Sequence, residues 1–162
     1  MPIEGPYAPS PRQPDATKVA SIEASRGADG VMHRGLPVVV LWTKGRRSAA
    51  VRKVPLIRVR NGDCYAVVGS FGGSPAHPMW FLNLTADPLV TLQDGADIGD
   101  FLAHVATGEE RTRWWRIAAE VFPDYDRYQG LVAREIPLVV LEPVQSAQSP
   151  QSRRQPGGSI SG

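Results

Sequence analysis

The sequence predicts an antiparallel β barrel that carries a few peripheral helices, a mainly β (α+β) fold. Three observations support this fold class: six short segments with the length and composition of strands, tight-turn dipeptides between several of them, and few helical segments. The chain has 162 residues, 42% of them hydrophobic and 21% charged. These values fit one folded domain and exclude a chain that is disordered or fibrous throughout.

The first half of the predicted barrel has three strands and one helix. Residues 36–43 form an apolar, β-branched run between two glycines, which predicts a buried strand. A loosely alternating strand is expected over 51–60 and a returning strand over 64–70, and Asn61-Gly62 between them is typical of a tight hairpin turn. A glycine-rich loop then leads to a helix over 78–86, with proline at its start.

The second half begins with strands over 89–93 and 99–105, joined by a turn at Asp94-Gly95. Thr107 and Glu110 have the spacing of a capping box, in which Thr107 is the N-cap and Glu110 reaches back to it.

Apolar residues at steps of three and four predict that this helix continues to Val121, where Phe122-Pro123 ends it. A second short helix over 125–133 and a last strand over 136–141 follow.

Both ends of the chain differ in composition from the middle. Residues 1–15 contain five prolines and are expected to form a flexible or extended arm, followed by a short helix over 17–26. The tail over 144–162 is rich in Ser, Gln, Pro and Gly and is expected to be disordered. The predicted folded domain is therefore 16–143.

The charges are unevenly distributed, although the formal net charge is only +2. Between Gly30 and Gly62 the chain has eight basic residues and no acidic one, whereas the rest has ten basic and sixteen acidic residues. A local positive field of this size favours an anionic partner. The aromatic residues of this segment and its neighbour, Trp42 and Tyr65, lie in predicted strands, so we do not expect a nucleic-acid partner.

Several other classes of protein are excluded. Cys64 is the only cysteine, which rules out a disulfide framework and a cysteine zinc site. The three histidines lack paired ligand spacing, so no metal site is predicted. Apolar runs are too short to span a bilayer, and we expect a cytoplasmic protein; peripheral membrane association and the choice between monomer and homodimer stay open.

Three stretches carry residues with chemical potential. The loop over 43–48, with the basic residues that follow it, is either an anion site or a solvated hairpin. In residues 70–84, glycines permit a ligand to approach the backbone closely. Trp80 and Asn83 lie one helical turn apart, and they either contact a ligand or pack in the core. Tyr125 and Tyr128 share a helical face, where they either line a polar pocket or pack in the core.

Taken together, these stretches resemble the deazaflavin-dependent nitroreductase family of actinobacteria and their relatives. The family pattern T-x-G-R-x-S-G-x-x-R corresponds to 43–52, and its P-x-W-x-x-N-L corresponds to 78–84. The hairpin at Asn61-Gly62, the glycine loop from Ser70, and 136–143 also match in order. The resemblance covers about residues 35–143.

The resemblance implies a split β-barrel of the FMN-binding type that binds coenzyme F420, a deazaflavin with a phosphate and a polyglutamate tail. It implies an enzyme that delivers hydride from the reduced cofactor to a quinone, a nitro compound or an activated enone. The tail would contact Arg46, Arg47, Ser48, Arg52 and Lys53. The ring would lie along Val54, Pro55, Leu56, Ile57, Val68, Gly69, Ser70 and Phe71, with Met79, Trp80, Phe81, Leu82, Asn83 and Tyr128 completing the pocket. Ser70, Tyr125 and Tyr128 would face the substrate as catalytic residues.

Three departures from the family pattern are present. Ala49 and Ala50 follow Ser48 where the family usually has glycine, which affects the path of the arginine loop. Phe71 replaces a lysine and removes a charge, and Ile57 replaces a tyrosine found near the substrate in some members. The changes at Phe71 and Ile57 leave open a protein that binds deazaflavin without turnover. A related split-barrel oxidoreductase that uses FMN is a second alternative.

Overall fold

The computed structural model describes residues 3–8, 19, 32–33 and 36–144. Most of the helix expected over 17–26, the remainder of the proline-rich arm, and the tail from 145 onward lie outside the described residues. Residues 3–8 run along the sheet: Tyr7 forms a parallel bridge with Val51, and the Ile3 N–H donates to Thr91 Oγ1 at 2.9 Å.

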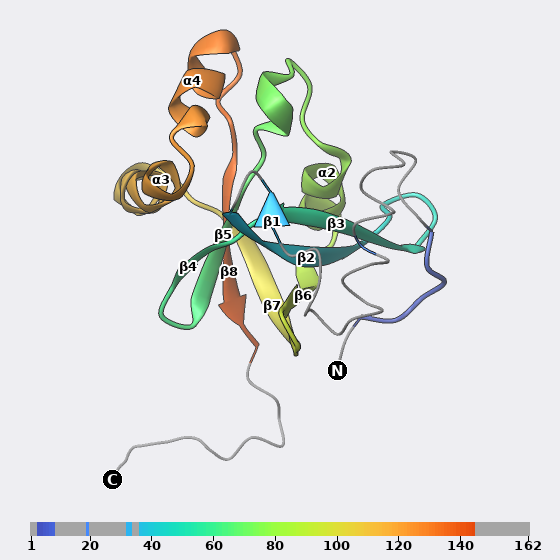
Figure 1. The fold of residues 1–162 in the computed structure, drawn as a ribbon. Coiled ribbons are helices and arrows are strands. Elements are labelled where there is room, and N and C mark those ends of the chain that lie inside the picture. The colour runs from blue at the N-terminus through green and yellow to red at the C-terminus, as the bar shows by residue number, and fades with distance from the viewer. Residues whose placement is uncertain (1–2, 9–18, 20–31, 34–35, 145–162) are drawn as a thin grey trace, which may run out of the picture.

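The described part of the chain folds into one curled antiparallel sheet with helices at its margins (Figure 1). Its strands are β1 (Met32–His33), β2 (Leu36–Lys44), β3 (Val51–Ile57), β4 (Val59–Asn61), β5 (Cys64–Val68), β6 (Leu89–Asp94), β7 (Asp97–Val105) and β8 (Leu138–Pro143). Its helices are η1 (Phe71–Gly73), α2 (Met79–Ala86), α3 (Gly108–Val121) and α4 (Asp124–Leu131). The strand order is β1-β2-β6-β7-β8-β5-β4, and β3 pairs with β2.

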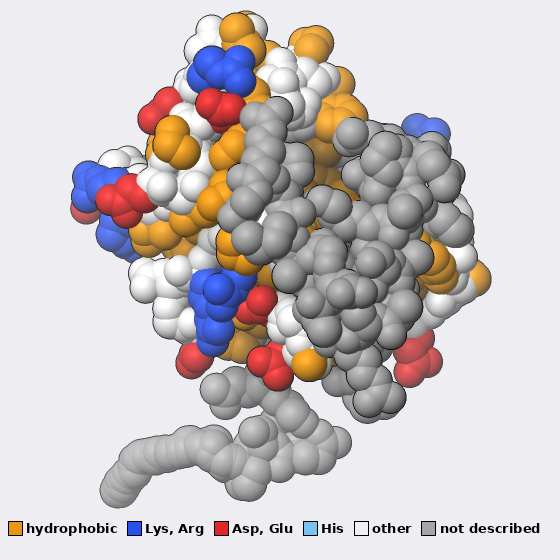
Figure 2. Space-filling view, in the orientation of Figure 1, with side chains coloured by type: hydrophobic (Ala, Val, Ile, Leu, Met, Phe, Trp, Pro, Cys, Tyr) orange, Lys and Arg blue, Asp and Glu red, His pale blue; other side chains and the backbone are white. Residues whose placement is uncertain are grey.

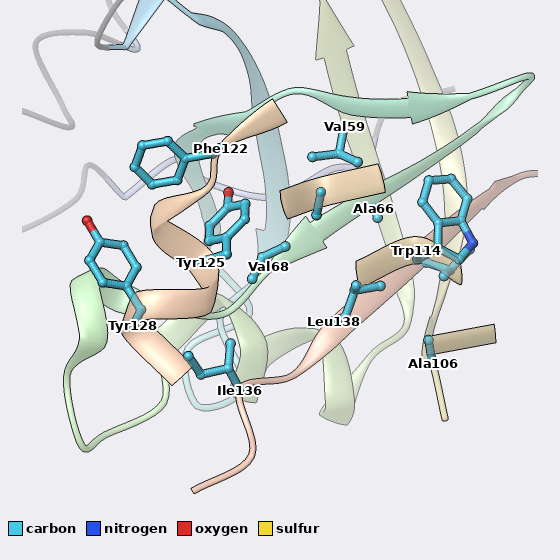
Figure 3. Packing of buried hydrophobic residues seen from close by; sticks show 12 residues of the cluster. Val59, Ala66, Val68, Ala106, Trp114, Phe122, Tyr125, Tyr128, Ile136 and Leu138 are labelled. Carbon is cyan, nitrogen blue, oxygen red and sulfur yellow. The ribbon is translucent and has the colours of Figure 1, made fainter. Parts of the chain in front are cut away.

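Strand β8 shows how the sheet separates two apolar clusters. It lies between β5 and β7, and four successive residues, 138–141, are fully or almost fully buried. Leu138 and Val140 pack in an outer cluster with Trp114, Ala118 and the tyrosines of α4 (Figure 3). Val139 and Leu141 face the opposite way. A strand covered on both faces has a continuous apolar run rather than alternation, which is why this segment was readable from sequence.

The inner cluster contains Val139, Leu141 and the buried residues Trp80 and Leu84 of α2. Helix α2 therefore packs against the inside of the curled sheet, while α3 and α4 pack against the other face. Figure 1 shows α2 beside β3, and α3 and α4 on the side of β4 and β5. Among the described residues, no helix has the length and apolarity needed to span a bilayer.

Two sequence expectations were wrong in detail. The single strand over 51–60 is interrupted at Arg58, because its N–H donates to Pro37 O at 2.9 Å and its side chain turns to Asp94. The capping box of α3 does not form: Thr107 is the N-cap residue without a side-chain bond. The Glu110 carboxylate instead lies 2.9 Å from His104 Nε2, across the start of the helix.

Candidate functional site

The first part of the candidate site is the turn between β2 and β3, here called the Arg loop (residues 45–50). The Gly45 N–H donates to Ala50 O at 2.7 Å, and the Ala49 N–H donates to Gly45 O at 2.9 Å. Ser48 Oγ accepts a bond from the Ala50 N–H at 3.2 Å. A Cβ at Gly45 would lie 2.8 Å from Ser48 Oγ, so a larger residue there would displace the hydroxyl that accepts from the Ala50 N–H.

A buried amide from α2 holds this turn in place. Asn83 Oδ1 accepts from the Arg46 N–H at 3.2 Å, and Asn83 Nδ2 donates to Thr43 Oγ1, also at 3.2 Å. Asn83 and Thr43 are both buried. Asn83, which we expected to bind the cofactor, thus fixes the position of the loop that carries the arginines.

The basic segment does not act as one surface. Arg58 donates to Asp94 at 2.9 Å with Arg60 nearby, so these two arginines share an acidic partner from β6. Lys53 Nζ lies 4.1 Å from the centre of the Trp42 ring, and Arg52 Nη1 donates to Ala8 O at 3.4 Å. On the face drawn in Figure 2, the basic side chains form several small groups, and acidic side chains lie beside most of these groups.

Arg46 and Arg47 differ from these residues. Both side chains are exposed, and neither has an acidic or other side-chain partner within the described parts of the chain. Ser48 is exposed beside them. Arg46 and Arg47 thus place two adjacent, exposed guanidinium groups on a fixed turn.

The residues expected beside the cofactor ring on β3 alternate between the two faces of the sheet. Val54 and Leu56 pack against the inner cluster, whereas Ile57 packs against the outer cluster. Lys53 is paired in register with Trp42, and Pro55 with Val40. All of these positions are half-buried except Val40. A flat ligand along β3 could contact its backbone throughout, but the side chains of only one face.

The second part of the candidate site is the Ser70 loop (residues 69–77), which follows β5 and includes η1. Val68, Gly69 and Ser70 are buried, and a Cβ at Gly69 would lie 2.7 Å from Pro137 Cγ. No described residue forms a hydrogen bond with the Ser70 hydroxyl. Phe71 is 43% exposed and has φ of +47°, a left-handed conformation that is rare for a bulky residue.

Helix α4 lies against this loop. A Cβ at Gly73 would meet Tyr128 Cδ1 at 3.5 Å, so the Tyr128 ring lies next to the loop. Tyr125 is buried, and its ring meets Phe122 edge-on at 5.0 Å. Figure 3 shows Tyr125 inside the cluster and Tyr128 at its edge. Burial raises the pKa of Tyr125, with a further increase from the neighbouring Tyr128.

Helix α2 contributes residues of two kinds. Met79 is 61% exposed, and Phe81 and Leu82 are half-buried, so these three side chains reach the surface. Trp80 belongs to the inner core together with Leu84, as the alternative interpretation of this helix stated. The His77 ring lies 4.9 Å from the Phe81 ring and joins the Ser70 loop to the helix.

Sequence reasoning missed Arg134, which lies between α4 and β8. Its guanidinium donates to the carbonyl oxygens of Gly69, Ser70 and Ser74 at 3.0–3.1 Å and lies 3.0 Å from His77 Nδ1. No local pattern could have found it, because its partners are 57 to 65 residues away in the chain.

One surface group among the described residues has metal-ligating side chains: His104, Glu110 and Glu142. Glu110 lies 2.9 Å from His104 Nε2, whereas Glu142 lies 3.7 Å from Nδ1. The two carboxylates therefore lie at opposite nitrogens of one imidazole ring, and we assign this group no role in the site.

Comparison with known proteins identifies the family. The family model of the F420H(2)-dependent quinone reductases matches residues 16–143. A putative F420H(2)-dependent quinone reductase of Mycobacterium tuberculosis is 31% identical over 108 residues, which cover 67% of this chain and 91% of that protein.

Solved structures agree with this assignment. An F420-H2 dependent reductase (FDR-A) is 43% identical, with a TM-score of 0.63, and the match covers 65% of this chain and 94% of the other. A structure described as a domain-swapped dimer is 39% identical, with a TM-score of 0.65, and the match covers 82% of this chain and 100% of the other. The expected split-barrel fold, the F420-dependent reductase class and the cofactor, reduced F420, are confirmed. The chain belongs to the F420H(2)-dependent quinone reductase family.

Proposed function

We propose that this chain transfers a hydride from reduced F420 to a quinone. The observation that carries the proposal is the Arg loop, on which Arg46 and Arg47 are exposed and lack an acidic partner among the described residues. The F420 tail is a chain of phosphate and carboxylate groups, and guanidinium forks suit both. The family name supplies the acceptor class.

The other residues present also fit the cofactor. Val54 and Leu56 on β3 and Phe81 on α2 are half-buried apolar side chains at the inner cluster, and they offer a surface for a flat ring. The Ser70 hydroxyl is uncommitted within the described structure and is available to a ligand. Phe71, in place of the family's lysine, adds apolar rather than charged surface beside it.

The protein's contribution is to bind, orient and stabilise charge. When bound, reduced F420 supplies the hydride, and a quinone needs one hydride and one proton to become a quinol. The Ser70 hydroxyl would donate a hydrogen bond to a carbonyl oxygen of the acceptor and stabilise the negative charge that develops there. Burial raises the pKa of Tyr125, which favours the protonated phenol, a hydrogen-bond donor.

In this proposal Tyr128 lines the acceptor side of the site. Its ring lies next to the Ser70 loop at Gly73, and it lies at the edge of the outer cluster (Figure 3). The single proton that the quinol needs besides the hydride would come from solvent at this edge. A cytoplasmic location, with or without peripheral membrane association, stays a prediction.

The proposal is tested by anaerobic mixing of the protein with reduced F420 and menadione, a simple naphthoquinone. The return of the fluorescence of oxidised F420 measures turnover, and we expect a rate well above that without protein. Nitro compounds and enones are tested in parallel. Tight F420 binding without turnover of any acceptor would favour the non-catalytic alternative, and tighter binding of FMN than of F420 would overturn the proposal.

The oligomeric state is a separate proposal: a homodimer. The relative described as a domain-swapped dimer supports it. So does an apolar pair on the exposed face of β6 and β7, where Leu89 and Leu102 lie opposite each other and are 39% and 50% exposed. Light scattering coupled to size-exclusion chromatography should give twice the chain mass, and a monomer at micromolar concentration would contradict the proposal.

A further inference from the structure

The feature that the family assignment leaves unexplained is the bonding of Arg134. Its Nε donates to Ser74 O at 3.0 Å, Nη1 to Gly69 O at 3.1 Å, and Nη2 to Ser70 O at 3.0 Å. Three carbonyl oxygens of one loop thus converge on a single planar group. Because a guanidinium can only donate, His77 Nδ1, at 3.0 Å from Nη1, is the acceptor, and the proton of that ring is on Nε2.

The charge of Arg134 has no carboxylate partner among the described residues. The neighbouring Glu135 turns away and lies 3.5 Å from Arg111 Nε. Burial lowers the pKa of Arg134, in keeping with a cation that is partly removed from water and bound by neutral groups. An arginine needed only for solubility or for a surface ion pair would not be placed in this way.

The backbone of Arg134 is itself tied to the helices. Gln129 on α4 donates from Nε2 to Arg134 O at 2.8 Å and accepts from the Ile136 N–H at Oε1, also at 2.8 Å. Arg111 on α3 donates to Ile136 O at 2.7 Å. The helix that carries Tyr125 and Tyr128 and the loop that carries Ser70 are therefore linked through Arg134.

We propose that Arg134 is a positioning residue for hydride transfer, which gathers the carbonyls of Gly69, Ser70 and Ser74 and so holds the Ser70 hydroxyl in register with Tyr128. The inference rests on the proposed function, in which Ser70 contacts the acceptor. Arg134 itself touches neither cofactor nor acceptor in this role. Its loss should therefore lower turnover more than F420 affinity, because the Arg loop that would bind the cofactor tail is held by Asn83 and not by Arg134.

The test compares Arg134→Ala with the control Arg116→Ala, which removes an exposed arginine from α3. We expect kcat to fall about 10- to 100-fold in Arg134→Ala, as for misplacement of a reacting group by about an ångström, and to be unchanged in the control. The Kd of oxidised F420, measured by fluorescence, should change little in either. Added guanidinium chloride should restore part of the kcat, with sodium chloride of equal ionic strength as its control.

Arg134→Lys separates charge from geometry and also serves if the alanine variant does not fold. A lysine keeps the charge, but one ammonium cannot match the planar fork that binds three carbonyls, so kcat should stay low. A double-mutant cycle with Ser70→Ala measures the coupling between Arg134 and Ser70 in kcat, which a purely structural role of Arg134 would not produce. If Arg134 acts through Ser70, its removal should cost much less in the Ser70→Ala background.

Each outcome decides a different question. Multiplicative losses in the cycle, no rescue by guanidinium, or full activity of the lysine variant would each overturn the positioning role of Arg134. A parallel loss of F420 affinity and kcat would also overturn it, because the substitution would then disturb the whole site and not the Ser70 loop alone. Absence of quinone reduction by the unaltered protein would refute the proposed function, and this inference with it.

Discussion

The Arg loop and the Ser70 loop are built alike but offer different chemistry. Each follows a strand, each is held by one side chain from a distant element, and each contains a non-glycine residue at positive φ, Ala49 at +58° and Phe71 at +47°. The Arg loop is held by the neutral amide Asn83 and leaves its cations in solvent. The Ser70 loop is held by the cation Arg134 and offers a neutral hydroxyl.

The difference indicates that the Arg loop contributes to cofactor affinity and the Ser70 loop to the hydride-transfer step. Free charge on an exposed turn attracts an anionic tail, and that attraction is screened by salt. A hydroxyl on a loop fixed by several hydrogen bonds can be aimed at a reacting group, and its effect depends on geometry. Loss of Asn83, and a change in ionic strength, should therefore mainly affect F420 affinity, whereas loss of Arg134 should mainly affect kcat.

The largest effect is expected from Asn83→Leu, which removes the tie of the Arg loop. Thr43 Oγ1 and the Arg46 N–H would lose their partners, and a buried group left without a hydrogen bond costs about 1–3 kcal/mol. The free energy of unfolding, measured in urea, should fall by about that amount, and the Kd of F420 should rise.

Thr85→Ala is the matched control on the same helix, since Thr85 is exposed and, among the described residues, its hydroxyl bonds only to Leu82 O. In Asn83→Leu saturated with cofactor, kcat should be close to that of the unaltered protein. A fall in kcat at saturating F420 would show that the two loops are not separate in function.

The next effect is expected from the double variant Arg46→Ala and Arg47→Ala. Two exposed charge contacts are each worth about 0.2–1 kcal/mol, so F420 affinity should fall roughly 2- to 30-fold. The dependence of affinity on salt should become shallower, because fewer ions are exchanged on binding. Fluorescence titrations at two salt concentrations measure both quantities, and an unchanged salt dependence would remove the Arg loop from tail binding.

A smaller effect is expected from Phe71→Lys, which restores the lysine of the family pattern. One added exposed charge should raise F420 affinity by about 2- to 5-fold at low salt and increase its salt dependence. This change would give the Ser70 loop a share of the electrostatic role that now belongs to the Arg loop. Unchanged affinity would indicate that position 71 does not face the tail.

The sequence predicted the strands and turns better than the side-chain contacts that join distant segments. Strand β8 and the Asn61-Gly62 turn were predictable because a strand in the core and a hairpin turn have local signatures. Glu110 was misassigned, because the capping-box spacing said nothing of His104 across the helix start. The same limit applies to the basic segment: its arginines were visible as a run of charge, but the pairing of Arg58 and Arg60 with Asp94 was not.

Arg134 is the clearest case of what local reasoning cannot supply. Its role comes from three carbonyls of a loop more than 50 residues away, and backbone carbonyls are present in every loop of every sequence. Only the folded arrangement of β5, β8 and α4 brings them to one guanidinium. Residues that hold a site are for this reason harder to find in a sequence than residues that touch a ligand.

The smallest effect is expected from Ala49→Gly, which tests whether the Arg loop stores strain. At φ of +58° an alanine Cβ crowds the following carbonyl at a cost of about 1–2 kcal/mol, whereas glycine accepts this conformation freely. The greater freedom of glycine in the unfolded chain offsets about 0.5–1 kcal/mol of this gain. The net stabilisation should be about 0.5 kcal/mol, or a rise in Tm of about 1–2 °C.

Calorimetry measures this shift in Tm, and the control is Ala96→Gly, which changes an exposed alanine beside the Gly95 turn. A lower Tm in Ala49→Gly would show that the alanine is accommodated without strain and that its replacement of the family glycine left the path of the Arg loop unchanged.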